Sequence, residues 1–277
     1  MSTARRPRSS RAQSRDYAER SRGLSFLRRY AFLASLETVA RLRSGGTALF
    51  LFSVLAACHP DTAAREPKPS DFPAAHRPVA SIVSPRWSDE PTRDKAGEAT
   101  DVMNRAGVKR GMTVADIGAG EGYYTIRLAT RIGKKGRVLA EDIVPQVRDA
   151  LAERVTRERL DAVSVRLGEP DDPKLPEASF DRVFMVHMYH EIESPYAFLW
   201  NLRPSVKPGG RVIVVDADRP TNLHGTPPKL LECEFAAVGY RMVDMQTMPA
   251  AGGYLAAFVP AGARPEPKAI RACEVAE

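Results

Sequence analysis

Short apolar runs alternate with amphipathic stretches through the middle of the chain. Apolar residues dominate five short segments, 114–117, 137–143, 163–167, 179–186 and 211–215. Between the first two runs, Tyr124, Leu128 and Ile132 recur every four positions, which is typical of a helix with one buried face. Strands that alternate with helices in this way predict an α/β domain built on a largely parallel sheet.

The same pattern extends to both sides of this region. It predicts a leading helix within 86–106, a helix at about 195–203, a helical segment at 232–239, and an antiparallel pair of strands at 240–246 and 253–259. We expect the leading helix to cover a ligand pocket and the antiparallel pair to close the sheet.

A glycine-rich turn follows the first predicted strand. The segment 114–124 reads VADIGAGEGYY, so that Gly118, Gly120 and Gly122 stand at alternate positions after Asp116. Such a turn brings the backbone close to a ligand, and the free N–H groups of the following helix favour a negatively charged group. A dinucleotide site usually reads G-x-G-x-x-G, and here the third glycine comes one residue early.

This turn resembles motif I of the class I S-adenosylmethionine-dependent methyltransferases. The turn Lys207-Pro208-Gly209-Gly210 before an apolar strand is a frequent companion of that motif, and the resemblance covers roughly residues 85–260. It implies a Rossmann-like α/β three-layer sandwich with a mostly parallel seven-stranded sheet and an antiparallel closing strand. It also implies S-adenosyl-L-methionine as the cofactor, with Asp116, Gly118, Gly120 and Gly122 around its methionine end.

Two further acidic positions follow from the resemblance. The second strand ends in Glu141-Asp142, about twenty residues past the glycines, and we choose Asp142 to accept the ribose hydroxyls. Adjacent strand residues point to opposite faces, so Glu141 is held as the alternative. After the third strand, Asp171 or Asp172 is expected near the adenine amino group, although acidic residues beside prolines are also ordinary turn formers.

Polar residues crowd the end of the fourth predicted strand. His187, Tyr189, His190 and Glu191 follow the apolar run, where a methyl acceptor is expected to lie in an open α/β sheet. The run resembles a Tyr-His-Glu motif in a subgroup of small-molecule methyltransferases. His190 is the preferred catalytic base and His187 the second choice, and both also fit a structural role in shaping the pocket.

The N-terminal region has the features of an export signal. Arg41 and Arg43 precede an apolar run at 47–57, which is too short to span a bilayer comfortably and is followed by Cys58. This resembles a bacterial lipoprotein cleavage box and implies a lipid anchor at Cys58. It predicts a lipid-anchored or periplasmic place in the cell envelope, or a cytoplasmic one if the segment is not a functional signal.

Charge and composition divide the chain into four parts. Residues 1–57 hold eleven arginines against three acidic residues and so carry a charge of +8. Because the whole chain carries +7, residues 58–277 have a net charge of −1. We therefore expect no nucleic-acid partner, and no protein partner is predicted. The predicted parts are an Arg-rich signal-like segment (1–57), a Pro/Ala-rich linker (58–84), the methyltransferase domain (85–260) and a loose tail (261–277). The three cysteines lack a metal-type spacing, so no metal site is predicted.

Three functions remain open on the sequence. The first is methyl transfer from S-adenosylmethionine to a small-molecule acceptor. The second is a non-catalytic envelope lipoprotein that retains the ligand-binding fold. The third, a nucleotide-dependent oxidoreductase, is disfavoured by the glycine spacing. The intact glycine turn and Asp142 favour the first over the second.

Overall fold

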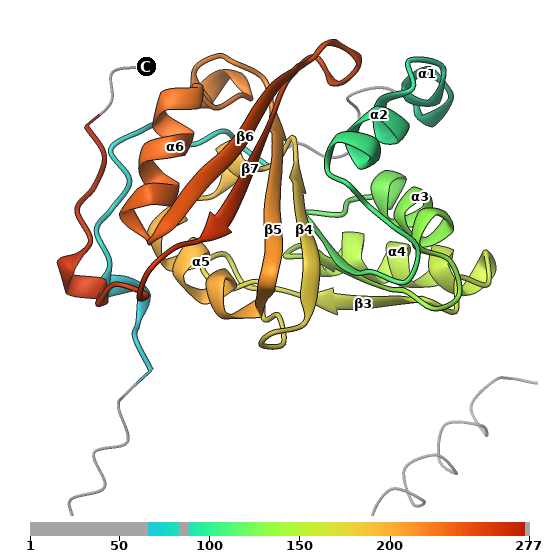
Figure 1. Cartoon of the computed structure of the whole chain (residues 1–277), viewed down its shortest axis with the longest axis horizontal. Coiled ribbons are helices and arrows are strands. Elements are labelled where there is room, and N and C mark those ends of the chain that lie inside the picture. Colours follow the sequence, from blue (N-terminus) through green and yellow to red (C-terminus); the bar gives the residue numbers. More distant parts are fainter. Residues whose placement is uncertain (1–65, 83–88, 275–277) are drawn as a thin grey trace, which may run out of the picture. The chain divides into compact units, whose positions relative to one another are not determined.

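Seven strands form one mixed sheet in the computed structural model, which describes residues 66–82 and 89–274. The order across the sheet is β3-β2-β1-β4-β5-β7-β6, with every pair parallel except the two pairs that involve β7. The predicted seven-stranded sheet with an antiparallel closing strand is confirmed (Figure 1). The strands are β1 (Thr113–Ile117), β2 (Arg137–Asp142), β3 (Val163–Leu167), β4 (Phe180–Val186), β5 (Val206–Asp216), β6 (Tyr240–Met248) and β7 (Gly253–Pro260).

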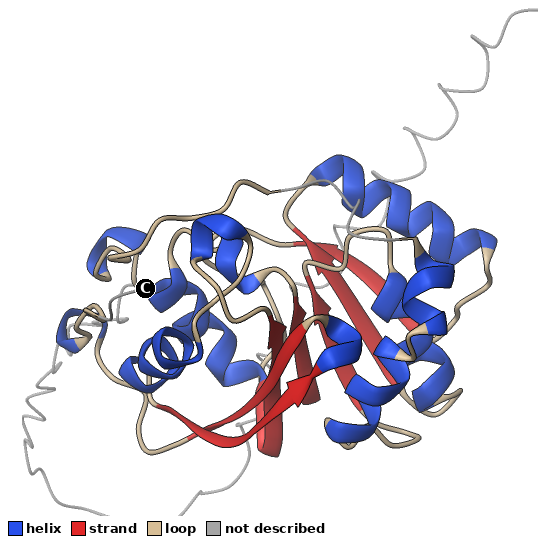
Figure 2. Ribbon diagram, turned by 90° about the horizontal axis from the view of Figure 1, so that it is seen from above, coloured by secondary structure: helices blue, strands red, loops and turns tan. Residues whose placement is uncertain are grey.

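Helices cover both faces of this sheet (Figure 2). One face packs against α2, α3 and α4, and the other packs against α5 and α6. Because both faces are buried, neighbouring strand residues enter opposite cores: Val114 packs with α3, while Ala115 and Ile117 pack with α5 and α6. The helices are α1 (Glu90–Lys95), α2 (Glu98–Arg105), α3 (Tyr123–Ile132), α4 (Pro145–Arg157), α5 (Pro195–Leu202) and α6 (Pro228–Ala237).

The strand order reverses between β1 and β4. The chain moves from β1 outward to β2 and β3, then returns to β4 on the other side of β1. In an open α/β sheet, ligands bind outside the carboxyl ends of the strands at this switch point. The glycine turn after β1 and the polar run after β4 therefore share one end of the sheet.

Two helices differ from the pattern expected from the sequence. The single leading helix is two helices, α1 and α2, because Gly97 adopts a left-handed conformation with φ of 71° between them. Helix α6 begins at Pro228, four residues before the expected start, with proline at its first position.

Residues 66–82, the N-terminal strap, pack against the domain rather than forming a free linker. The guanidinium Nε of Arg77 donates to Glu234 Oε1 at 2.9 Å, and both side chains are 1% exposed. Thr221 Oγ1 donates to Pro78 O, and Ala80 N donates to His190 O. Figure 1 shows the strap, in cyan, passing along α6. The predicted linker is therefore wrong for this part of the range.

Residues 261–274, the C-terminal tail, are also attached to the domain. A disulfide joins Cys273 to Cys233 of α6, Cys273 N donates to the Tyr196 hydroxyl at 2.7 Å, and Ile270 lies in the core beneath α5 and α6. The expectation of a loose tail is wrong for these residues, because the disulfide and the buried Ile270 fix them.

The predicted signal segment lies outside the described residues, as does Cys58. Among the helices that the structure describes, none combines the length and apolar content that crossing a bilayer requires.

Candidate functional site

The glycine turn after β1 has the backbone that its sequence predicts. Gly118, Gly120 and Gly122 have φ of 63°, 56° and 89°, in the left-handed region that favours glycine. A β-carbon on Gly122 would lie 2.5 Å from Leu151 Cδ1, and one on Gly118 would lie 3.0 Å from Met188 Cγ. The turn therefore depends on glycine for both its conformation and its close packing.

Asp116 joins the end of β1 to the first turn of α3. Its Oδ2 accepts a hydrogen bond from Thr125 Oγ1 at 2.6 Å, and the side chain is buried. Burial raises the pKa of Asp116 to about 6, although the hydrogen bond from Thr125 acts in the opposite direction. Asp116 does not line the cavity described next, so the contacts that the structure shows for it steady the turn, and its place beside the cofactor stays a prediction.

A cavity of about 680 Å³ opens at the carboxyl ends of β1, β2 and β4. This volume lies within the range of about 300–1,000 Å³ that is typical of small-molecule sites. Its walls include Gly118 and Gly120 from the turn, Glu141 and Asp142 from β2, and His187 after β4. These five sequence-predicted residues thus meet at the switch point of the sheet.

Asp142 connects the glycine turn to the segment that follows β2. Its Oδ2 accepts from Gly120 N at 3.1 Å, and its Oδ1 accepts from Val144 N at 2.9 Å. The side chain also lines the cavity. Asp142 therefore lies on the cavity wall while it holds the turn in place, and its contact with a ribose stays a prediction.

Glu141 lines the same cavity and is almost fully buried. Among the described residues, its Oε1 has no hydrogen-bond partner. Burial raises the pKa of Glu141 to about 8, and the neighbouring charge of Asp142 acts in the same direction. The side chain is therefore largely protonated at neutral pH.

We predict that Glu141 makes the fold less stable as pH rises. Its native pKa of about 8 exceeds the ordinary 4.5, so the folded chain holds a proton that the unfolded chain loses. The free energy of unfolding should fall by a few kcal/mol at most between about pH 4.5 and 8, since one pKa unit corresponds to about 1.4 kcal/mol. Denaturant titrations above about pH 7, where Asp116 is largely ionised, isolate this effect.

Glu141→Gln should flatten the pH dependence of stability in that window. Glu153→Gln is the matched control, because Glu153 is an exposed carboxylate on α4. An unchanged slope in Glu141→Gln would contradict the assignment of the raised pKa.

The two aspartates expected near adenine lie in a turn beside the cavity. Pro170 lines the cavity, whereas Asp171 and Asp172 do not. The carbonyl of Asp171 accepts from Asn201 Nδ2, and Asp172 Oδ1 accepts from Lys174 N at 2.7 Å. Their contacts are those of turn-forming residues, so the expected contact with adenine stays a prediction that this geometry does not favour.

The two histidines differ sharply in position. His187 lines the cavity with φ of 54°, an uncommon conformation for a residue other than glycine. Burial lowers the pKa of His187, which keeps its ring neutral near pH 7. His190 is fully buried and does not line the cavity, because Asp216 at the end of β5 binds its Nδ1. This geometry therefore does not favour the predicted choice of His190 over His187 as the base.

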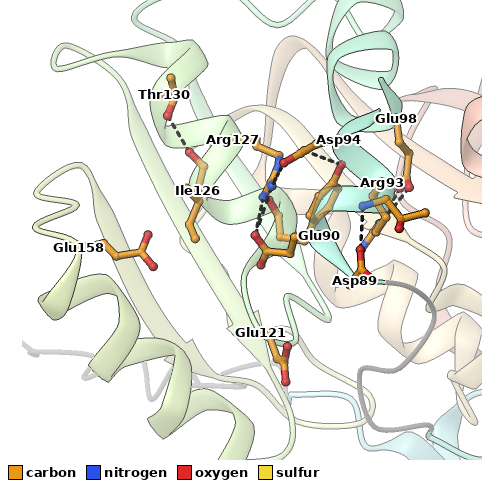
Figure 3. Close-up of polar contacts among 12 residues, drawn as sticks. Asp89, Glu90, Arg93, Asp94, Glu98, Glu121, Ile126, Arg127, Thr130 and Glu158 are labelled. Atoms are coloured by element: carbon orange, nitrogen blue, oxygen red, sulfur yellow. Dashed lines mark hydrogen bonds and ion pairs between the residues drawn. The ribbon is translucent and has the colours of Figure 1, made fainter. Parts of the chain in front are cut away.

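Helix α1 forms another wall of the cavity through Glu90 and Arg93. Figure 3 shows Glu90 directed at Arg127 of α3, and Glu90 Oε1 also accepts from Arg154 Nη1 of α4 at 2.6 Å. Arg93 lies 3.7 Å from the centre of the Tyr123 ring. These ion pairs fasten α1 over the start of α3, so the leading segment covers the pocket as the sequence predicts.

Sequence reasoning missed several wall residues that come from distant parts of the chain. Ala80, Ser81 and Ile82 of the strap and the segment 250–252 after β6 contribute to the cavity. None of these belongs to a motif. Only the folded arrangement brings them to the site.

A family model described as a methyltransferase domain matches residues 115–214. This stretch of the chain is similar to a methyltransferase domain. The match runs from β1 to β5, and it includes the glycine turn, Asp142 and both histidines after β4.

Named relatives agree with this family match. Over 123 residues the chain is 31% identical to the ubiquinone/menaquinone biosynthesis C-methyltransferase of Azotobacter vinelandii, covering 42% of this chain and 47% of that protein. It is 26% identical over 121 residues to a demethylmenaquinone methyltransferase of a Geobacillus species, covering 44% and 52%. The chain thus spans about half the length of the curated relatives it matches.

A solved structure supports the fold. A SAM-dependent methyltransferase from Aquifex aeolicus superposes with a TM-score of 0.53 at 24% identity, covering 62% of this chain and 97% of that one. Identity at this level shows the fold, and the Rossmann-like architecture implied by the resemblance is confirmed.

Proposed function

We propose that this protein transfers the methyl group of S-adenosylmethionine to a small-molecule acceptor. The observation that carries the proposal is the cavity at the β1/β4 switch point, where the glycine turn and the Asp142 carboxylate meet. The methyltransferase family match to residues 115–214 supports the same reaction class.

The charge of the cavity wall suits this cofactor. S-adenosylmethionine carries a positive sulfonium and a positive amino group, and negatively charged walls concentrate cationic ligands. Even without the largely protonated Glu141, carboxylates outnumber guanidinium groups on the wall: Glu90, Glu98, Glu121, Asp142, Glu191 and Glu193 stand against Arg93 and Arg219. Apolar Ile143, Val147 and Pro170 offer a surface for the adenine ring.

The reaction asks little of the protein beyond positioning. Attack of a nucleophile on the methyl carbon, with the sulfur as leaving group, is accelerated mainly by holding the two reactants in line. If the acceptor carries a proton, His187 is our preferred base, because its ring is on the cavity wall and neutral near pH 7. The buried His190 is the second choice.

We infer the class of acceptor from the relatives. Two of them are named for ubiquinone/menaquinone biosynthesis and for demethylmenaquinone methylation, so a quinone ring is the first acceptor to test.

We also propose that the domain works in the cell envelope, anchored by lipid at Cys58. The Cys233–Cys273 disulfide supports this location, because disulfides persist mainly in oxidising compartments. Mass spectrometry of the native N-terminus tests the anchor. A mature chain that begins with lipid-modified Cys58 is expected, and an unmodified Cys58 within a longer chain would contradict it.

Calorimetry on the full chain tests the proposed activity at the level of binding. We expect S-adenosylhomocysteine to bind with one site per chain and NAD not to bind. Binding of NAD alone would favour an oxidoreductase, and binding of neither would leave the non-catalytic lipoprotein.

A further inference from the structure

A second group of donor atoms lies beside the cavity, at the ends of β4 and β5. The group, which we call the His190 cluster, consists of His190, Glu191 and His224. His190 and Glu191 belong to the 3-10 helix η2 (Tyr189–Glu191), and His224 follows the 3-10 helix η4 (Thr221–Leu223). One nitrogen or oxygen from each residue lies within 4.8 Å of the other two.

His190 is held in one orientation by a buried carboxylate. Its Nδ1 lies 3.0 Å from both oxygens of Asp216, and both side chains are fully buried. Asp216 is fixed in turn by Thr226 Oγ1 at 2.7 Å and Ala217 N at 2.9 Å. A carboxylate at Nδ1 selects the tautomer that carries its proton there, so the lone pair of the ring lies on Nε2.

The Nε2 atom of His190 is buried and has no hydrogen-bond partner within the described part of the chain. A buried acceptor without a partner is unfavourable and calls for an explanation, such as an ion. Because Asp216 occupies Nδ1, Nε2 is the ring atom with which His190 can contribute to the cluster.

Two imidazoles and one carboxylate form a donor set used by catalytic zinc sites. Metal-binding histidines almost always donate their other ring N–H to a carboxylate or carbonyl, as His190 does to Asp216. Zinc bonds of 2.0–2.2 Å in tetrahedral geometry require donor separations of about 3.3 Å. The donor atoms lie within 4.8 Å of one another, so they would have to approach by up to about 1.5 Å to bind one ion.

We propose that the His190 cluster binds a divalent transition-metal cation, with zinc as the ion its donors favour. Three protein ligands leave a fourth coordination position for water or an oxygen of another molecule. Glu191 also lines the cavity, so the cation would border the same space. A contact between the cation and the methyl acceptor rests on the proposed function, whereas binding of the cation does not.

The test is zinc binding by the full chain without a polyhistidine tag, after removal of bound metal with a chelator. Calorimetry with Zn²⁺ should give one equivalent per chain. Loss of one ligand, in His224→Ala or Glu191→Gln, should weaken binding at least about 100-fold, because loss of an outer partner alone typically costs about 10–100-fold. Asp216→Asn should fall in that lower range.

His76→Ala is the matched control, since His76 is an exposed histidine outside the cluster. Circular dichroism shows whether each variant is folded, and Zn²⁺ should raise the melting temperature of the unmodified chain but not that of His224→Ala. No zinc binding by the unmodified chain, or equal binding by His224→Ala and His76→Ala, would overturn the inference.

Binding of S-adenosylhomocysteine by the same samples separates the two proposals. Zinc binding without nucleoside binding would leave the metal site and remove the methyl-transfer function. Nucleoside binding without zinc binding would keep the methyl-transfer function and remove the metal site.

Discussion

Asp142→Ala is expected to weaken the binding of S-adenosylhomocysteine by about 100-fold or more. The carboxylate accepts from the backbone of Gly120 and Val144, so its loss frees the glycine turn as well as removing the proposed ribose ligand. Hydrogen bonds to a charged group contribute about 1.5–3 kcal/mol each, and 1.4 kcal/mol is a factor of ten in affinity. Calorimetry on the full chain measures the change.

Asp171→Ala is the matched control for this experiment. Asp171 is also an aspartate close to the site, but it does not line the cavity. We expect its replacement to leave the affinity within a few-fold of the original. An equal loss of affinity in the two variants would support the expected contact between Asp171 and adenine. Unchanged affinity in Asp142→Ala would refute the assignment of Asp142 to the ribose.

Arg77→Ala is expected to lower the free energy of unfolding by about 3–5 kcal/mol. Removing the guanidinium leaves the buried Glu234 without its ion-pair partner, while among the described residues the Tyr189 hydroxyl still donates to its other oxygen at 2.7 Å. The substitution also removes the hydrogen bond from Arg77 Nη2 to the carbonyl of Ile192. Denaturant titration of the full chain measures the loss.

Arg105→Ala provides the comparison at the surface. Arg105 pairs with Asp101 at the same N–O distance of 2.9 Å, but the two side chains are 34% and 36% exposed. An exposed pair contributes about 0–1 kcal/mol, so this variant should be nearly as stable as the unmodified chain. If Arg77→Ala were equally mild, the strap would not be an integral part of the domain.

Much of the fold follows from local sequence patterns. The strands before Gly118 and Asp142 are short apolar runs bounded by turn residues, and both lie where the sequence predicts them. The glycine turn is equally local, since its conformation depends on residues within a few positions. For the same reason the sequence could predict that residues of this turn lie on the wall of a cavity.

The acceptor side was less predictable because it depends on contacts between distant residues. Nothing within the segment 187–191 shows that His190 turns inward, because its partner Asp216 lies 26 residues later. His224, brought to the same place by the loop after β5, has no sequence spacing that suggests a metal ligand. The lack of a metal-type cysteine spacing therefore could not exclude a metal site built from histidine and glutamate.

The composition of the strap was similarly misleading. Residues rich in proline and alanine favour a flexible linker by composition, yet one buried ion pair outweighs that tendency. Arg77 finds its partner Glu234 on α6, 157 residues away, and no local pattern records such a contact.

The separation of Arg77 from Glu234 in the sequence affects how the protein folds during its synthesis on the ribosome. At about 5–20 residues per second, translation needs about 8–30 s to advance from Arg77 to Glu234. Cys233 waits a further 40 residues for Cys273. Helix α6 therefore binds both the first and the last described segments of the chain. The strap cannot dock until α6 has been synthesised, so the domain cannot fold stepwise from its N-terminus.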